Sequence, residues 1–245
     1  MSKLDEYRSQ LRKLGDWRLF LLSNSGLPGP RGNLELAQAV AELADPEQVE
    51  SLLATPPREA PENSPGVFVV FCGVTALGRL AAGGNQKYWR RLRPYASDER
   101  WRVREAVAIG LQYVGDANMV LLLEQMQNWI KGNSYEKRAA AAALAEPRLL
   151  KDPESAGTVL RMFDEITVEI ASSPPPHDES FKILRQAMGY CWSVAVAALP
   201  EAGKPLMERW LRTPSPDAGW MMRENLKKKR LRKMDAKWVA KWRVK

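Results

Sequence analysis

The chain has 245 residues, with 37 lysines and arginines against 29 aspartates and glutamates, and a formal net charge of +8. Its 45% hydrophobic and 27% charged residues are ordinary for a folded protein, and no apolar run approaches the ~20 residues of a membrane span. A single histidine and two cysteines that stand far apart argue against a structural zinc site and a disulfide framework. We therefore expect no metal and no cofactor, and the polar first residues favour a cytoplasmic protein.

The first third of the chain contains two loops and one strongly apolar segment. Residues 23–33 and 55–66 are rich in glycine, proline, serine and asparagine, which interrupt helices. The run 67–71 is rich in β-branched and aromatic residues, but it continues into 75–80 without a turn signal. The pattern therefore predicts a buried helix over 66–82.

Helical periodicity continues through the rest of the chain. The residues that form one apolar face at helical spacing are Val103, Val107, Gly110, Leu111 and Val114. A second such face comprises Phe181, Leu184, Met188, Cys191 and Ala195. Together these elements predict an all-α fold of helices joined by short turns.

A short motif occurs twice at the same four offsets. Its first copy is Asp98, Trp101, Arg104 and Glu105, and its second copy is Asp217, Trp220, Arg223 and Glu224. The aspartate can cap a helix, the tryptophan can pack on a neighbouring unit, and the arginine can reach an aspartate in the adjacent turn. This pattern resembles a HEAT-type repeat, which implies a right-handed α-solenoid of helical hairpins. The repeat is clear over about 85–222 and weaker over 1–84, so residues 1–222 are predicted to form the solenoid.

The segment 223–245 carries the positive charge, with 11 basic and two acidic residues and a net charge of +9. As one helix it would present a basic stripe of Lys227, Arg230, Lys233, Lys237 and Lys241. A second stripe, about 100° around the helix, would comprise Leu231, Met234, Trp238 and Trp242. We expect a basic amphipathic helix that caps the solenoid and turns its basic stripe to phosphates. The alternatives are a solvated cap and peripheral contact with an anionic membrane through Trp238 and Trp242.

The middle of the chain also resembles the bacterial DNA alkylation-repair glycosylases, which are built from HEAT-like repeats. That family places a tryptophan and an acid one helical turn later in its groove, and here Trp101 and Glu105 stand in this register. Glu105 replaces the family's aspartate, and Arg100 stands where the family doubles the tryptophan. The stretch 184–192 resembles the one that carries a second aromatic, with Tyr190 or Trp192 in that role. In the alternative interpretation, Trp101 packs between repeats and Glu105 pairs with an arginine one turn away.

Arginines beside this motif would extend a basic groove if they face the same side, and Arg100 and Arg102 are the first candidates. We therefore predict a non-enzymatic HEAT-like binding scaffold whose partner is nucleic acid, DNA rather than RNA, or an acidic protein. The first alternative is a DNA glycosylase that removes alkylated bases with Glu105 as its carboxylate. The second is a protein–protein adaptor, whose binding would survive moderate salt because phosphate contacts would not dominate it.

Overall fold

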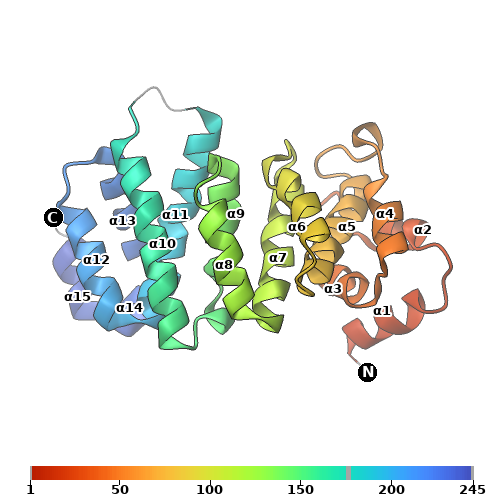
Figure 1. Ribbon diagram of the computed structural model, residues 1–245, viewed down its shortest axis with the longest axis horizontal. Helices are drawn as coiled ribbons and strands as arrows, with labels where there is room; N and C mark the ends of the chain where they lie inside the picture. Colours follow the sequence, from red (N-terminus) through yellow and green to blue (C-terminus); the bar gives the residue numbers. More distant parts are fainter. Residues whose placement is uncertain (1, 175–177, 244–245) are drawn as a thin grey trace. The chain divides into compact units, whose positions relative to one another are not determined.

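The computed structural model describes residues 2–174 and 178–243 (Figure 1). Within these ranges the protein is all-α, with fifteen α-helices, three short 3₁₀ helices and no strand, which confirms the predicted class. The chain divides into two compact units, Met1–Ala117 and Asn118–Lys245. This boundary differs from the expected division at residue 223, and each unit is described by itself.

The first unit is built around one buried helix. Its α-helices are α1 (Lys3–Leu11), α2 (Arg18–Asn24), α3 (Leu34–Leu43), α4 (Pro46–Leu53), α5 (Pro65–Ala81), α6 (Gln86–Leu92) and α7 (Trp101–Ala117), with 3₁₀ helices at Pro57–Glu59 and Arg93–Ser97. Helix α5 packs against α2, α3, α4, α6 and α7, which confirms the buried helix predicted over 66–82. Ser64 caps it by accepting a hydrogen bond from the Val67 N–H, and Pro65 occupies its first turn.

Helices α5 and α7 approach each other most closely at two glycines. A Cβ atom on Gly78 would lie 2.3 Å from the Cα atom of Gly110, a distance that no packed carbon can tolerate. The apolar face predicted for α7 is buried on both sides of this crossing, at Val103, Val107 and Leu111. The two glycines therefore bring the central helices of this unit together.

The second unit consists of two layers of helices (Figure 1). Its α-helices are α8 (Met119–Trp129), α9 (Ser134–Leu144), α10 (Pro153–Ser172), α11 (Glu179–Ala198), α12 (Pro200–Arg212), α13 (Pro216–Leu226), α14 (Lys229–Met234) and α15 (Ala236–Arg243), with a 3₁₀ helix at Pro147–Leu149. Helix α10 packs on α8 and α12 in one layer, and α11 packs on α9 and α13 in the other. Contacts between α10 and α11 join the layers, an arrangement compatible with a helical repeat.

A buried asparagine fastens α13 to α11. The Asn225 side chain is fully buried, and its Nδ2 donates 2.8 Å hydrogen bonds to the carbonyl oxygens of Met188 and Met221. Its Oδ1 accepts a 2.7 Å hydrogen bond from the backbone N–H of Ser193. Because all three bonds lie in the core and two of them reach α11, this side chain fixes how the two helices meet.

The C-terminal segment is not the single helix expected from its charge pattern. Helix α13 ends at Leu226, and two short helices follow, the second of them capped by Asp235, which accepts a 2.9 Å hydrogen bond from the Trp238 N–H. The break at Asp235 turns α15 back on α14, so a continuous stripe does not form. The separation of faces is nevertheless as predicted, since Leu231 is buried and Lys233 is exposed.

The apolar side of this segment docks on α12. Trp238 and Trp242 are buried, the Trp238 indole donates a 2.8 Å hydrogen bond to Glu208, and Arg212 lies 4.8 Å from the Trp242 ring centre. Burial alone would raise the pKa of the Glu208 carboxyl, but hydrogen bonds from Trp238, Trp242 and Arg212 lower it overall. Both indole rings are therefore packed against α12, and neither is exposed at the surface, where it could insert into a membrane. Over the described residues, no helix combines the length and apolar character of a membrane span.

Candidate nucleic-acid interface

The two arginines predicted to line a basic groove in the first unit are buried. Arg100 forms a two-pronged ion pair with Asp98, with N–O distances of 2.8 and 2.7 Å, and this pairing raises the pKa of the guanidinium. Arg102 donates to the carbonyl oxygen of Gly29 at 2.8 Å and to the Asn63 side chain at 2.9 Å. These guanidinium groups fasten the loops before α3 and α5 to α7, so their charges are used internally.

Trp101 and Glu105 lie together, as the resemblance to the glycosylases implies. They line one cavity of about 150 Å³ with the aromatic side chains of Phe68 and Phe71. The Trp101 side chain is 43% exposed, and the Arg102 guanidinium lies 4.4 Å from its ring centre. Trp101 is therefore a partly exposed residue beside a cavity.

Trp192 is not available to a ligand, contrary to expectation. Its side chain is fully buried between α10 and α11, where the indole donates a 3.0 Å hydrogen bond to the Thr167 hydroxyl and lies beside Phe163. The residue follows the apolar periodicity of α11, which takes it into the core of the second unit. Of the two aromatics proposed from the stretch 184–192, only Tyr190 reaches the surface.

Tyr190 is the centre of a basic and aromatic surface. Its ring is 45% exposed, with the Arg230 guanidinium 4.8 Å and the Lys228 ammonium 5.6 Å from the ring centre. Arg230 also donates a hydrogen bond to the Tyr190 hydroxyl. The contact is possible because α14 packs directly on α11, which brings a residue of the basic segment to a helix forty residues earlier.

A pocket of about 320 Å³ is lined by residues of α11 and α13 and by Lys228. Its lining residues are Lys182, Arg185, Gln186, Gly189, Trp220, Glu224 and Lys228. The Arg185 guanidinium lies 4.4 Å from the Trp220 ring centre and forms an ion pair with Asp217. Gly189 admits this ring, because a Cβ atom there would lie 3.3 Å from it. The pocket thus combines one indole ring with two cations of α11 and with Lys228 from the turn before α14.

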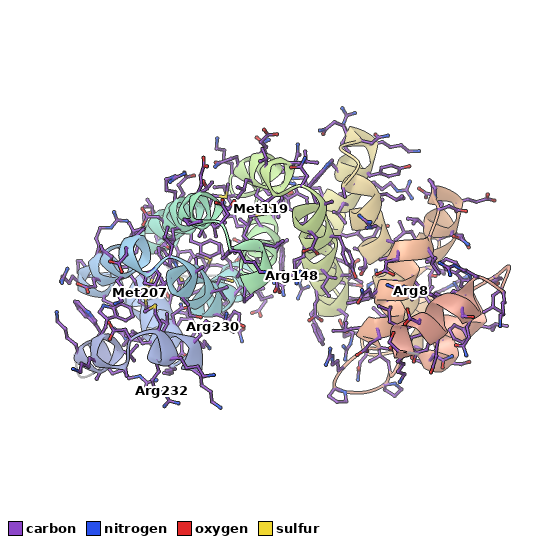
Figure 2. The ribbon with its side chains drawn as sticks, turned by 90° about the horizontal axis from the view of Figure 1, so that it is seen from below. Arg8, Met119, Arg148, Met207, Arg230 and Arg232 are labelled. Carbon is purple, nitrogen blue, oxygen red and sulfur yellow. The ribbon has the colours of Figure 1, made fainter. Side chains whose placement is uncertain are left out.

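We call this surface the α11–α14 face. It comprises Lys182, Arg185, Gln186, Tyr190, Trp220, Lys227, Lys228 and Arg230. Two carboxylates within it are already paired, Asp217 with Arg185 and Glu224 with Lys227. Figure 2 shows Arg230 and Arg148 on the side of the unit that faces away from Met119 of α8. The face therefore carries cations around two aromatic rings, with Lys182 and Lys227 exposed and Arg185, Lys228 and Arg230 half-buried.

Sequence patterns identified part of this face and missed the rest. Tyr190, Lys227 and Arg230 are among the predicted binding residues, and Lys233, Lys237 and Lys241 are exposed as predicted. Lys228 was missed because it lies outside the basic stripe when 223–245 is drawn as one continuous helix. In the structure the chain turns at Lys228, and this turn brings its side chain to the face. Trp220 carried a signal as the repeated tryptophan, but its place beside Gly189 depends on a contact between helices distant in sequence.

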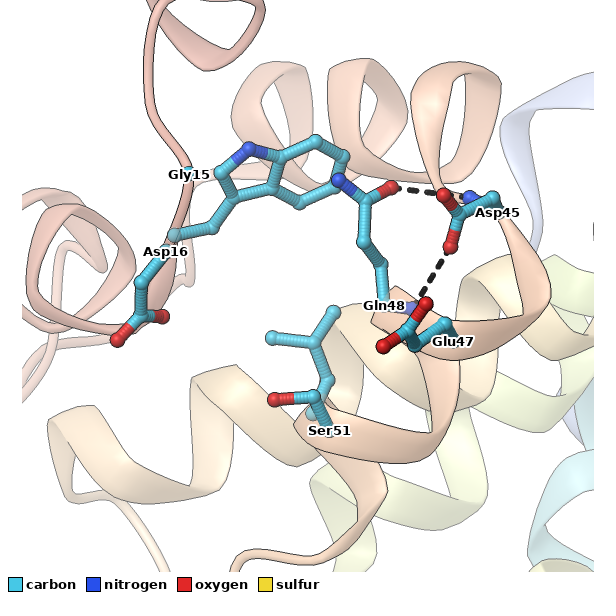
Figure 3. Close-up of a pocket in the computed structure, with 8 residues that line it drawn as sticks. Gly15, Asp16, Asp45, Glu47, Gln48 and Ser51 are labelled. Carbon is cyan, nitrogen blue, oxygen red and sulfur yellow. Dashed lines mark hydrogen bonds between the residues drawn. The ribbon is translucent and has the colours of Figure 1, made fainter.

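A pocket in the first unit has the opposite character (Figure 3). It has a volume of about 370 Å³ and is lined by the acidic residues Asp16, Asp45 and Glu47, together with Gln48 and Ser51 among others. Asp45 and Gln48 form the capping box of α4, with reciprocal hydrogen bonds of 2.8 and 3.0 Å. Two polar groups of this pocket therefore serve as the N-terminal cap of α4. The acidic residues that line the pocket repel phosphate. Across the described ranges, no three histidine, cysteine or acidic side chains gather as metal ligands.

No known protein family matches the chain, and comparisons with curated proteins and with solved structures give no match. The function is therefore argued from the α11–α14 face itself.

Proposed function

We propose that the protein is a non-enzymatic, HEAT-like helical scaffold that binds nucleic acid through the α11–α14 face. The observation that carries this proposal is the exposed ring of Tyr190, held between Lys228 and Arg230 beside a pocket with further cations. Cations supply the contacts to phosphates that dominate the affinity of nucleic-acid-binding proteins, and aromatic rings add contacts to bases and sugars.

The charge of the C-terminal segment supports the same partner. Helix α14 packs on α11 and carries exposed basic residues next to the face, and Lys237 and Lys241 continue the exposed charge along α15. A segment with a net charge of +9 attached to a nearly neutral chain favours a polyanion over a neutral partner. DNA is the polyanion we propose first, with RNA and an acidic protein as the alternatives.

The α-solenoid remains part of the proposal. In the second unit the helices alternate between two layers along the chain, as stacked helical hairpins do. The ion pair between Arg185 of α11 and Asp217 of α13 joins equivalent helices of successive pairs, as a contact between stacked repeats would. Asp217 does not cap α13, as its place in the motif predicted, because Ser215 caps that helix. Extension of the same right-handed solenoid to the first unit rests on the repeated residues alone.

Binding is tested by fluorescence anisotropy with labelled DNA at several salt concentrations. The variant Lys227→Ala, Lys228→Ala, Arg230→Ala removes three cations from the face, and its control is Lys131→Ala, Lys151→Ala, Arg161→Ala, which removes three exposed cations elsewhere in the unit. Point variants are preferred to truncation at residue 223, which would delete the buried Asn225.

We expect wild type and control to bind with the same steep loss of affinity as salt rises. The face variant should bind about tenfold or more weakly at low salt, and its salt slope should fall by up to about 2.7, since each lost phosphate contact removes about 0.9. Equal binding by the two variants would overturn the assignment of the face. No binding by wild type at low salt would overturn the proposed function, and salt-resistant binding to a protein would favour the adaptor.

One observation favours a second function. Trp101 and Glu105 share a cavity lined by aromatic side chains. The resemblance to alkylation-repair glycosylases requires a tryptophan and an acid to lie together in this way. A glycosylase would release modified bases from alkylated DNA, and Glu105→Gln would abolish the release because the carboxylate would no longer stabilise a developing positive charge on the sugar. Absence of base release by the wild-type chain would eliminate this alternative.

A further inference from the structure

From the geometry around Tyr190 we infer that the α11–α14 face binds single-stranded nucleic acid, with an unpaired base stacked on the Tyr190 ring. This inference rests on the proposed function and specifies its substrate. A duplex presents phosphates to a surface and keeps the faces of its bases inside the stack, so a duplex-binding surface has little use for an exposed ring. An unpaired base has a free face that can lie on an aromatic side chain.

The ring is held in place before any ligand arrives. The hydrogen bond from Arg230 fixes the Tyr190 hydroxyl, and this guanidinium lies 4.8 Å from the ring centre. The residue stands on α11, a helix of 20 residues that is buried along its other side. A ring fixed on a rigid helix loses little conformational freedom when a base stacks on it, which favours affinity.

Cations lie close to the Tyr190 ring and line the neighbouring pocket. Lys228 lies 5.6 Å from the Tyr190 ring centre and also lines the pocket that contains Trp220. It can therefore bind the phosphate that connects a nucleotide on Tyr190 to a neighbour in the pocket. Lys182 and the exposed amide of Gln186 lie on α11 along the same pocket. The face thus offers two aromatic rings with cations between and beside them, the combination found on surfaces that bind single strands.

The test compares a labelled oligothymidine strand with a duplex of equal length by fluorescence anisotropy. Tyr190→Leu removes the aromatic ring and keeps an apolar side chain, whereas Tyr190→Phe keeps the ring and removes only the hydroxyl. Tyr88→Leu is the matched control, because Tyr88 is a partly exposed tyrosine of the first unit with a lysine 5.9 Å from its ring centre. Thermal melts of all variants confirm that each is folded.

We expect the wild type to bind the single strand more tightly than the duplex. Tyr190→Leu should weaken single-strand binding by about 5- to 160-fold, the loss that corresponds to one stacked aromatic. Its salt slope and duplex affinity should stay unchanged, because no phosphate contact is lost. Tyr190→Phe and Tyr88→Leu should bind the strand within about threefold of wild type.

Two results would overturn the inference and leave the proposed function intact. The first is duplex binding that equals or exceeds strand binding. The second is equal affinity of Tyr190→Leu and Tyr190→Phe for the strand. This result would mean that no base stacks on the ring and that Tyr190 only positions Arg230. If no oligonucleotide binds wild type at low salt, the proposed function itself fails, and the inference fails with it.

Discussion

The most direct test of the fold around the face is removal of the Asn225 side chain. Asn225→Ala deletes three buried hydrogen bonds, two to carbonyl oxygens and one from the Ser193 N–H. Each buried hydrogen bond contributes about 1 kcal/mol net, and the Asn225 side chain is fully buried. The free energy of unfolding should therefore fall by about 3 kcal/mol.

The assay is thermal unfolding followed by circular dichroism. For a chain of this size about 1 kcal/mol corresponds to 2–4 °C in Tm, so Asn225→Ala should melt about 6–12 °C below wild type. The control is Gln186→Ala, on the exposed side of α11, which should leave Tm within about 2 °C. If Asn225→Ala also melts within about 2 °C of wild type, the asparagine does not fasten α13 to α11.

Three further predictions concern packing, pH and thiol chemistry. Gly78→Ala should lower the free energy of unfolding by about 3 kcal/mol in urea melts, because its Cβ would overlap backbone, whereas Gly15→Ala, with open space around it, should be neutral. The hydrogen bond from Trp238 helps to hold the pKa of Glu208 below 4.5 against the effect of burial, so its stabilisation is full above that pH and is lost as pH falls through the folded value. Glu208→Gln should therefore lose less stability than wild type between pH 5 and pH 3, and parallel pH curves would contradict this. Burial raises the pKa of the Cys191 thiol to about 12, so a thiol reagent at pH 8 should label it only after denaturation; rapid labelling of the native protein would contradict its buried position.

The sequence was sufficient to predict the fold class and the main apolar faces. An apolar run without a turn signal identified the buried helix over 66–82. Periodicity identified the faces of α7 and α11, because apolar spacing follows from the geometry of a helix. It failed at the C-terminus, where Asp235 caps a new helix inside a run that reads as one continuous helix. In the sequence, an aspartate within a charged segment is indistinguishable from any other surface acid. Its role as a cap depends on its hydrogen bond with a backbone N–H, which only the structure gives.

The candidate site was predicted only in part, for reasons of the same kind. Tyr190 and Arg230 were both identified, but their contact depends on how α14 returns to α11, which local patterns do not encode. Arg100 and Arg102 look like groove cations in the sequence, and their burial follows from loop atoms that lie far away along the chain. Charge composition therefore did not show which of these cations lie at the surface.

The central claim is that nucleic acid binds on the α11–α14 face. Ultraviolet crosslinking of the full chain to an oligothymidine strand that contains a photoreactive base, followed by mass spectrometry of the crosslinked peptides, tests it most directly. We expect adducts on Tyr190 or Trp220, and their loss at high salt. Crosslinks that fall instead on the first unit, beside Trp101, or that persist unchanged in the variant Lys227→Ala, Lys228→Ala, Arg230→Ala would contradict it.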